Sequence, residues 1–360
     1  MFQNVTDKNH ADETVLTIVQ GKGTLPREQA GRNIHYDNAS LSNYKMVQKG
    51  DFIIHLRSFE GGLEIANENG IVSPAYTILR GKKPHSSRFY EAYFHTDEFI
   101  NHILSKSVEG IRDGRQISYD AFKWLSIPYC NPNEQEKIAD LFSTLSRRIE
   151  KQSALVDSLK KYKRGLLSFA FEEMSISDNA NAITYLFSEI AQRRKEKYCP
   201  DSGVEYPCIE LEHIEQGTGR LLGSVSSTAQ SSTKTVAKTG DVLFGKLRPY
   251  LRKFAFAEQD MVCSSEIWVF VPSKYVLPKY LYYLIQTEHF MQVANISSGT
   301  KMPRAEWENI EKEPFDIPCI SVQEQIVSIM EALDNEICLS DDIIRSLSNA
   351  KTGLLQQLFI

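Results

Sequence analysis

The sequence predicts an α+β protein in which two domains of mixed α/β structure are joined by two long antiparallel helices, a coiled-coil spacer, with pseudo-twofold symmetry. Three observations predict it. Similar helix beginnings lie 190 positions apart, at Asn131 and Ser321 (321 minus 131). Each is followed by a long amphipathic run, and strand patterns upstream also recur. The predicted boundaries are 1–130 for the first domain, 131–172 for the first helix, 173–320 for the second domain and 321–360 for the second helix.

The strand patterns of the two domains repeat in part. Residues 50–54, GDFII, match residues 240–244, GDVLF, and each is a turn followed by an apolar run that favours a strand. One part does not repeat: residues 183–190 open the second copy, whereas residues 1–13 are polar and differ from them. We therefore expect the first domain to lack its opening segment.

Both long helices begin with residues that favour a helix N-terminus. Asn131 is the predicted N-cap of the first helix, Pro132 takes its first position, and Glu134 completes a capping box. Ser321 is the predicted N-cap of the second helix, with Glu324 in the equivalent place. A glutamine follows each of these glutamates, as Gln135 and Gln325.

Apolar residues then recur along both helices. The two heptad series of the first helix are Ile138, Leu145, Leu159, Leu166 and Leu141, Leu155, Tyr162, Phe169. The stripe of the second helix comprises Ile326, Met330, Leu333, Ile337, Ile344, Leu347, Leu354 and Leu358. At 1.5 Å per residue the first helix is roughly 58 Å long. We expect the stripes to pack against each other, with Gly165 and Gly353 allowing close approach. The alternative is two separate helices, each packed on its own domain.

The overall composition indicates a globular protein. The chain has 360 residues, 42% of them hydrophobic, which is enough for two or three domains. No apolar run approaches the ~20 residues of a membrane helix, so we expect a cytoplasmic protein. The six cysteines lack the spacing of a zinc site or a disulfide framework. The net charge of −5 is not typical of nucleic-acid binding, but basic clusters at residues 160–164, 193–197 and 246–253 make the charge uneven.

The motifs of common catalytic sites are missing from the sequence. It has no glycine-rich strand–turn–helix for S-adenosylmethionine, no GxxxxGK[ST] phosphate loop and no histidines at metal-ligand spacing. Residues 131–134, NPNE, resemble the Asn-Pro-Pro-aromatic motif of DNA amino-methyltransferases only superficially, because the second proline and the aromatic residue are absent. We therefore predict no catalytic residue, no metal site and no cofactor on this chain.

Three motifs run in a fixed order along the chain. Residues 127–139 and 317–327 have the pattern "IP.P…EQ..IA" in whole or in part, residues 49–52 and 239–242 carry a "KGD"-like strand beginning, and residues 297–302 contain "SSGT". Each motif is weak alone, but their order and duplication make the set specific. Together they resemble the specificity subunits of type I restriction–modification systems, over nearly the whole chain.

This resemblance implies a non-catalytic, sequence-specific DNA-binding subunit. Two target-recognition domains would each read one half of a bipartite DNA site, and the helices would set the spacer between the halves. The implied partners are double-stranded DNA, two modification (methyltransferase) subunits and restriction (translocase/nuclease) subunits. S-adenosylmethionine, ATP and Mg would be held by those partners. The alternatives are a scaffold that does not read DNA, a silent specificity cassette, or part of a self-sufficient restriction or modification enzyme.

Basic, amide, hydroxyl and carboxylate side chains on loops are the groups that meet phosphates and base edges. In the second domain the candidates for DNA contact are Lys246, Arg248, Tyr250, Arg252, Glu266, Ser298, Thr300, Lys301 and Arg304. In the first domain they are Arg57, Ser58, Ser73, Tyr76, Arg112, Arg115 and Gln116. Glu266 is a candidate acceptor for a cytosine amine. For any single residue, a solvated surface position explains the sequence as well.

Overall fold

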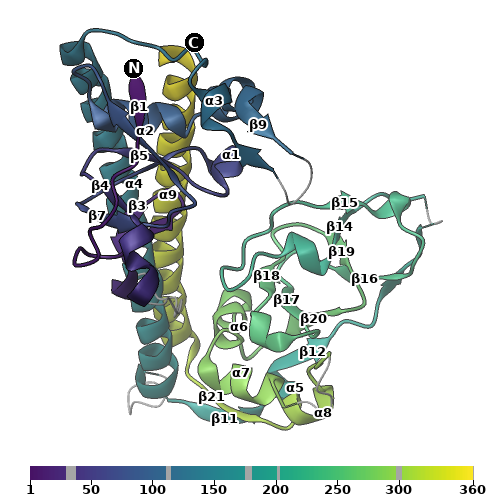
Figure 1. Ribbon diagram of the computed structural model, residues 1–360. Helices are drawn as coiled ribbons and strands as arrows, with labels where there is room; N and C mark the ends of the chain where they lie inside the picture. Colours follow the sequence, from purple (N-terminus) through teal and green to yellow (C-terminus); the bar gives the residue numbers. More distant parts are fainter. Residues whose placement is uncertain (30–37, 111–114, 175–180, 201–202, 297–301, 360) are drawn as a thin grey trace. The chain divides into compact units, whose positions relative to one another are not determined.

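The computed structural model describes residues 1–29, 38–110, 115–174, 181–200, 203–296 and 302–359. They form two units (Figure 1): unit 1 is Met1–Ser153 with Asp342–Ile360, and unit 2 is Ala154–Asp341. The two long helices are α4 (Pro132–Phe169) and α9 (Ile320–Leu358). Each of them has one part in unit 1 and the other part in unit 2. This confirms the predicted fold class of mixed domains with long helices. No helix in the described ranges is both long and apolar enough to cross a membrane.

Unit 1 is organised around a four-stranded antiparallel sheet of order β1-β8-β5-β6. Its strands are β1 (Phe2–Val5), β8 (Thr77–Gly81), β5 (Phe52–Ile54) and β6 (Glu64–Ile65). The amphipathic helix α2 (Ser87–Phe94) places Tyr90 and Phe94 in one core with Phe52. Ser86 caps this helix by accepting a hydrogen bond from the Phe89 amide.

Smaller elements complete the described part of unit 1. Its further strands are β2 (Leu16–Val19), β3 (Gly23–Pro26), β4 (Lys45–Val47), β7 (Gly70–Val72), β9 (Val108–Glu109) and β10 (Gln116–Ile117), paired as β2-β3, β4-β7 and β9-β10. Its short helices are α1 (Ser58–Gly61) and α3 (Tyr119–Phe122), with a π turn over Glu98–Ile103 and 3-10 turns over Arg27–Gln29, Asn38–Asn43 and Leu104–Ser107.

Unit 2 repeats the central sheet of unit 1. Its order is β12-β20-β17-β18, with β12 (Ala191–Arg193), β20 (Ile267–Pro272), β17 (Val242–Gly245) and β18 (Phe254–Phe256). The covering helices are α6 (Pro278–Leu284) and α7 (Glu288–Ala294). Phe244 and Phe270 of the sheet share one core with Tyr280 and Phe290 of these helices.

Unit 2 also contains a second sheet and several smaller elements, and part of that sheet repeats the β4-β7 pair of unit 1. A second, five-stranded sheet has the order β13-β16-β19-β14-β15, with β13 (Lys197–Tyr198), β16 (Lys234–Ala237), β19 (Met261–Cys263), β14 (Pro207–Ile209) and β15 (Val225–Ser226). The strands β11 (Ile183–Leu186) and β21 (Pro314–Ile317) pair with each other. The remaining elements are α5 (Phe187–Ile190), α8 (Trp307–Ile310), a π turn over Ala170–Met174 and 3-10 turns over Leu211–His213, Ser227–Ala229 and Pro249–Leu251.

The opening of the first domain is more complete than its sequence indicates. Strand β1 pairs with β8 as β12 pairs with β20, so unit 1 has the first strand of its central sheet. The described residues of unit 1 hold no counterpart of β11 and α5, which are residues 183–190. The expectation that the first domain lacks its opening segment stays a prediction.

The repeated Gly-Asp motif has a structural role in both units. Asp51 accepts hydrogen bonds from the Gln48 amide and from the guanidinium of Arg80, at 2.7–3.2 Å. In unit 2, Asp241 accepts equivalent bonds from the Lys238 amide and Arg194. Both carboxylates are buried. Each aspartate thus closes a turn and neutralises an arginine beside the sheet, which stabilises the beginning of β5 or β17.

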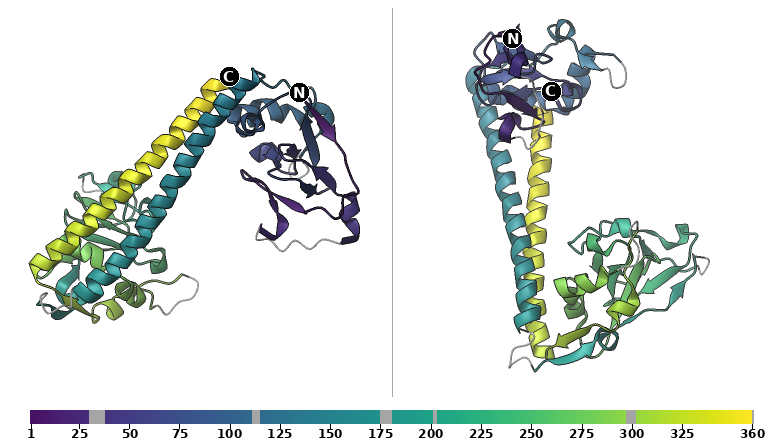
Figure 2. Two further views of the ribbon diagram at one scale, coloured as in Figure 1. Left: turned by 90° about the vertical axis from the view of Figure 1, so that its left-hand side faces the viewer. Right: turned by 60° about the horizontal axis from the view of Figure 1, so that its bottom comes forward.

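In unit 1 the two long helices run antiparallel. Near the end of α9, Phe359 stacks on Phe142 of α4 with ring centroids 6.1 Å apart. Earlier in α9, the Nζ of Lys351 donates to the Oγ of Ser146 at 2.8 Å. Residues earlier in α9 therefore contact residues later in α4, as expected for antiparallel helices. Figure 2 shows the two helices side by side.

In unit 2 the same pairing is made by charged groups. The Nζ of Lys163 lies 2.6 Å from Asp334, and that of Lys160 lies 3.7 Å from Asp341. Asp334 also accepts a hydrogen bond from the hydroxyl of Tyr283 on α6, at 2.9 Å. These contacts join α4, α9 and the core helix of the domain, so the packing alternative of two separate helices is wrong.

The predicted contact stripe of α4 is wrong in one of its two series. Leu141, Leu155, Tyr162 and Phe169 are all exposed. The series one residue later is buried or half-buried instead and comprises Phe142, Ile149, Val156, Lys163 and Ala170. The expected role of Gly165 and Gly353 is also wrong, because a Cβ at either position would meet nothing within 4 Å.

The second helix begins before its predicted cap. Helix α9 starts at Ile320, so Ser321 lies in the first turn and Cys319 takes the cap position, its carbonyl accepting from the Val322 and Gln323 amides. The helix starts are 188 positions apart (320 minus 132), not 190. In α4, Asn131 is the cap, and its side chain accepts from the Asn133 amide at 2.9 Å.

Candidate nucleic-acid interface

In unit 2 the chain brings the two predicted DNA-contact segments together. After β17, Leu247 forms an antiparallel bridge with Arg304. On either side of it, the Lys246 carbonyl accepts from the Ala305 amide at 2.8 Å, and the Arg248 amide donates to the Pro303 carbonyl at 2.8 Å. Segments 246–252 and 302–305 are therefore neighbours. Ser298, Thr300 and Lys301 lie outside the described residues.

The backbone around Arg248 is held in an uncommon conformation. Arg248 and Arg252 have φ of 53° and 50°, the left-handed region that non-glycine residues rarely occupy, and they flank the single turn Pro249–Leu251. Such conformations occur preferentially at functional sites. The side chain of Arg248 is exposed and has no partner among the described residues, and Tyr250 is 53% exposed. This turn thus presents a cation and a phenol to solvent.

Arg252 differs from Arg248 in its contacts. Its NH2 group lies 2.6 Å from both carboxylate oxygens of Glu288, and its NH1 group donates to the Gln286 carbonyl at 3.4 Å. Arg252 therefore fixes the turn to the start of α7. The structure favours a structural role for this predicted contact residue.

Glu266 and Arg304 form a second pair on the same surface. The Nε and NH2 groups of Arg304 lie 3.1 and 3.3 Å from the Glu266 carboxylate oxygens. Arg304 is half-exposed and Glu266 partly exposed. A carboxylate held by a fork of two N–H groups is pre-oriented, and its free lone pairs suit the amino group of cytosine or adenine.

A residue that was not among the sequence candidates provides another exposed guanidinium in unit 2. The guanidinium of Arg193, at the end of β12, lies over the rings of Trp268 and Trp307, at 5.4 and 4.6 Å from their centroids. Arg193 is exposed, and both tryptophans are half-buried. Stacking restricts the guanidinium while its N–H edge stays available. The basic run at 193–197 was the only sequence signal for it.

In unit 1 the counterpart of this turn carries Arg57. Its side chain is exposed, and its amide donates to the Nδ1 of His55 at 3.3 Å. Ser58 is fully buried, and its Oγ accepts from the His55 amide at 2.9 Å. Ser58 therefore stabilises the turn and is not part of the exposed surface. Burial lowers the pKa of His55 and keeps its ring neutral.

Two of the other candidates of unit 1, Arg115 and Tyr76, have contacts beside the same turn. The guanidinium of Arg115 lies 4.4 Å from the ring centroid of Phe59 and 3.7 Å from Glu60. Gln116 is exposed on β10. Ser73 is partly exposed and accepts from the Ala75 amide, and Tyr76 is half-buried with its ring 6.5 Å from that of His55. Arg112 lies outside the described residues.

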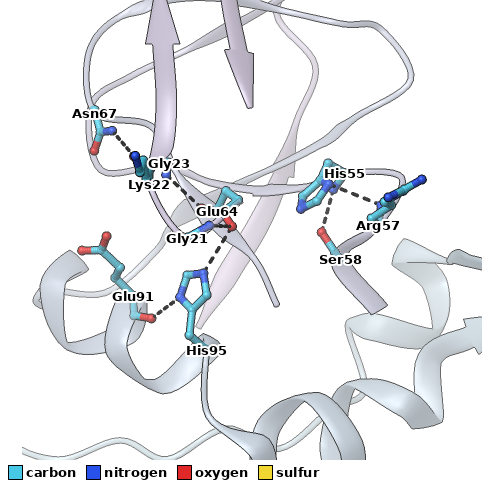
Figure 3. Close-up of polar contacts among 10 residues, drawn as sticks. All are labelled: Gly21, Lys22, Gly23, His55, Arg57, Ser58, Glu64, Asn67, Glu91 and His95. Carbon is cyan, nitrogen blue, oxygen red and sulfur yellow. Dashed lines mark hydrogen bonds and ion pairs between the residues drawn. The ribbon is translucent and has the colours of Figure 1, made fainter. Parts of the chain in front are cut away.

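A charged network inside unit 1 joins Glu64 and His95 (Figure 3). The carboxylate of Glu64 accepts from the amides of Gly21 and Gly23 at 2.7 and 2.9 Å, and from the Nε2 of His95 at 3.3 Å. The Nδ1 of His95 donates to the Glu91 carbonyl at 2.8 Å. Burial opposes the charge on His95, but its bonds to Glu64 and Glu91 outweigh this and raise its pKa. The network fixes the β2–β3 hairpin to the core.

The pKa of Glu64 also results from burial and hydrogen bonding acting in opposite directions. Burial alone would raise its pKa, but the hydrogen bonds from His95 and the two glycine amides leave it lowered. Among the described residues, no group of three or more His, Cys, Asp or Glu side chains is arranged to hold a metal ion.

Comparisons with known proteins agree on one family. Residues 183–349 match the family described as the type I restriction modification DNA specificity domain. The chain is 25% identical to the EcoDI specificity subunit of Escherichia coli over 262 residues, which cover 63% of this chain and 58% of that protein. It is 29% identical to the HindI specificity subunit of Haemophilus influenzae over 135 residues, 35% of this chain and 29% of that protein. The chain thus spans less than two thirds of either relative.

Solved structures show the same fold. The specificity subunit of a type I restriction–modification system from M. genitalium has a TM-score of 0.55 at 15% identity, covering 100% of this chain and 96% of that chain. A chain from a structure on the assembly and conformational transition of the type I system has a TM-score of 0.56 at 13% identity, covering 99% and 97%. Residues 183–349 therefore match a type I restriction modification DNA specificity domain, and the chain shares its fold with solved type I specificity subunits.

Proposed function

We propose that this chain is the non-catalytic, DNA-reading subunit of a type I restriction–modification complex, in which each unit reads one half of a bipartite site. One observation carries the proposal: Arg248 is exposed and unpaired among the described residues, on a strained turn that pairs with the Arg304 segment. A guanidinium in this position suits guanine edges or phosphates. Arg57 is its counterpart in unit 1.

The net charge of −5 limits what this chain does alone. Contacts to phosphates supply much of the affinity of DNA-binding proteins and need clustered cations. We infer that partner subunits provide part of that grip, while the exposed residues of this chain choose the sequence. The long helices then set the unread gap between the half-sites.

The chemistry belongs to partners in this proposal. Two modification subunits bring S-adenosylmethionine, flip an adenine out of each half-site and methylate it. Restriction subunits join for ATP- and Mg-dependent translocation and cleavage. This chain determines where both activities occur.

The direct test is a methylation map of DNA from cells that co-express this chain with the modification subunit encoded beside it. Methyladenine at a two-part motif with a fixed gap is the expected result. Methylation of a single half-motif would show that one unit does not read. A stable complex that methylates nothing would favour the scaffold or silent-cassette alternative, and methylation by this chain alone would indicate a self-sufficient enzyme.

A further inference from the structure

Two glutamines occupy the same buried position at the start of the two long helices. Gln135 is the fourth residue of α4, and Gln323 is the fourth residue of α9. Both side chains are completely buried, although the residues around them are mostly exposed. A buried carboxamide must satisfy its hydrogen bonds within the protein.

In unit 1, Gln135 connects α4 to the core helix of the domain. Its Oε1 accepts from the amide of Ser86, the N-cap of α2, at 2.9 Å. Its Nε2 donates to the carbonyl of Cys130, five residues earlier, at 2.8 Å. One side chain therefore holds three parts of unit 1: α2, α4 and the segment that leads into α4.

In unit 2, Gln323 makes the same connection. Its Oε1 accepts from the amide of Leu277, the N-cap of α6, at 2.8 Å. Its Nε2 donates at 2.9 Å to the carbonyl of Pro318, again five residues earlier, and at 2.9 Å to that of Tyr275. The arrangement thus occurs twice in one chain whose loops otherwise differ.

The equivalence is hidden in the sequence by a two-residue shift. Aligning the two Glu-Gln pairs matches Gln135 with Gln325, which is exposed. The helix starts instead match Gln135 with Gln323. Gln325 therefore provides a control position that has the same residue type, lies in the same turn and is exposed to solvent.

The chemistry of this position requires an amide. Each side chain accepts from an amide and donates to a carbonyl, so a carboxylate would lose the donor and place its charge against carbonyl oxygens. An apolar side chain of the same length would leave the cap amide and the carbonyls unpaired, which is costly in a buried site.

We propose that Gln135 and Gln323 are positioning residues that fix the direction in which each recognition domain leaves its long helix, and so determine how sharply the complex prefers one gap between half-sites. The inference rests on the proposed function. The half-site sequences are chosen by other residues, such as Arg248. Loss of either glutamine would therefore weaken the preference for the native gap and leave the preferred bases unchanged.

The experiment compares methylation rates of the complete complex on duplexes that differ only in the gap. Purified complex of this chain with its modification subunit is given S-adenosylmethionine and DNA with the native gap, or a gap one base pair longer or shorter. For Gln323→Glu and Gln135→Glu we expect the preference for the native gap to fall about tenfold, equivalent to about 1.4 kcal/mol. Gln323→Met, which introduces no charge, should act in the same direction.

Gln325→Glu is the matched control and should keep the wild-type gap profile. An equal loss of methylation rate on all gaps in the Gln135 and Gln323 variants would indicate a general structural role for these glutamines and overturn the inference. An unchanged profile in a folded Gln135 or Gln323 variant would also overturn it. A wild-type complex that prefers no gap at all would instead contradict the proposed function.

Discussion

Arg248 and Arg252 show how two residues of one type, four positions apart, acquire different roles. Both have left-handed backbone, but only Arg252 is held by Glu288. Their letters in the sequence are equivalent, and the difference arises from α7, which lies more than thirty residues later along the chain. We therefore expect base reading to depend on Arg248 and turn stability on Arg252.

Replacing Arg248 tests this assignment. Arg248→Asn removes the guanidinium and suits the left-handed backbone, since asparagine adopts it more readily than other residues do. We expect the methylation rate at the half-site read by unit 2 to fall by about tenfold to a hundredfold, the loss of one base contact, with little change in melting temperature. Arg252→Asn is the control and should lower the melting temperature instead. The reverse pattern would contradict the assignment.

His95 supports a prediction about pH. Its pKa is raised in the folded state, so its contribution to stability is present below the unfolded value of about 6.5 and is lost as pH rises through the folded pKa. The lowered pKa of Glu64 keeps that partner charged at mildly acidic pH.

His95→Gln removes the charge and keeps a hydrogen-bonding side chain. We expect it to destabilise unit 1 by about 1–2 kcal/mol near pH 5.5 and by less near pH 8.5, measured by urea denaturation at both pH values. His10→Gln, at a half-exposed histidine beside Asp7, should have little effect at either pH. A difference that grows with pH would have the wrong sign for this mechanism.

At the scale of elements, the sequence predicted the long helices well and their contact surface less well. The apolar period located α4, but the buried series includes Lys163, which a search for apolar letters excludes. Lys163 is buried because its Nζ is paired with the Asp334 carboxylate at 2.6 Å and donates a hydrogen bond to the Oε1 of Gln286 at 3.2 Å. Those partners lie on α9 and beside α6, and local periodicity carries no information about them.

This buried pair should stabilise unit 2 more than its exposed neighbour does. The side chains of Lys163 and Asp334 are 10% and 29% exposed, so Asp334→Ala leaves a lysine largely without solvent and frees the Tyr283 hydroxyl. We expect a loss of about 2 kcal/mol in unfolding free energy, measured by urea denaturation. Asp341→Ala breaks the longer, more exposed pair with Lys160 and should cost about 0–1 kcal/mol. Equal losses would show that burial does not decide the strength of these pairs.

At the scale of the whole molecule, the repeat predicted two domains with two helices because both copies keep the same turn, strand and helix-start residues. It did not predict the five-stranded sheet of unit 2, whose strands β14 and β15 come from residues 207–226, a region without similarity to the first copy. The central strands of the shared sheet need only short apolar runs, which survive divergence. The strands of the variable segments form by pairing with residues far along the chain. A single sequence does not reveal such pairing.

Shortening both helices together tests their role as the spacer. Deleting Lys151–Asp157 from α4 and Asp342–Ser348 from α9 removes one heptad from each and keeps the packed faces within about 20° of their register. Seven residues span about 10.5 Å of helix, or roughly three base pairs at 3.4 Å each. If the helices lie along the DNA, the methylation map should show the same half-site bases with a gap shorter by about three base pairs.

The rate at the new gap should also be lower than the wild-type rate. Removing three base pairs rotates one half-site by almost a third of a DNA turn relative to the other, whereas the deletion rotates the helices much less. Recognition domains that follow their helices rigidly therefore meet the shortened site out of phase. Deleting the seven residues from α4 alone is the control and should disrupt the pairing of the helices. A new set of half-site bases with an unchanged gap would exclude the helices as the element that measures the spacer.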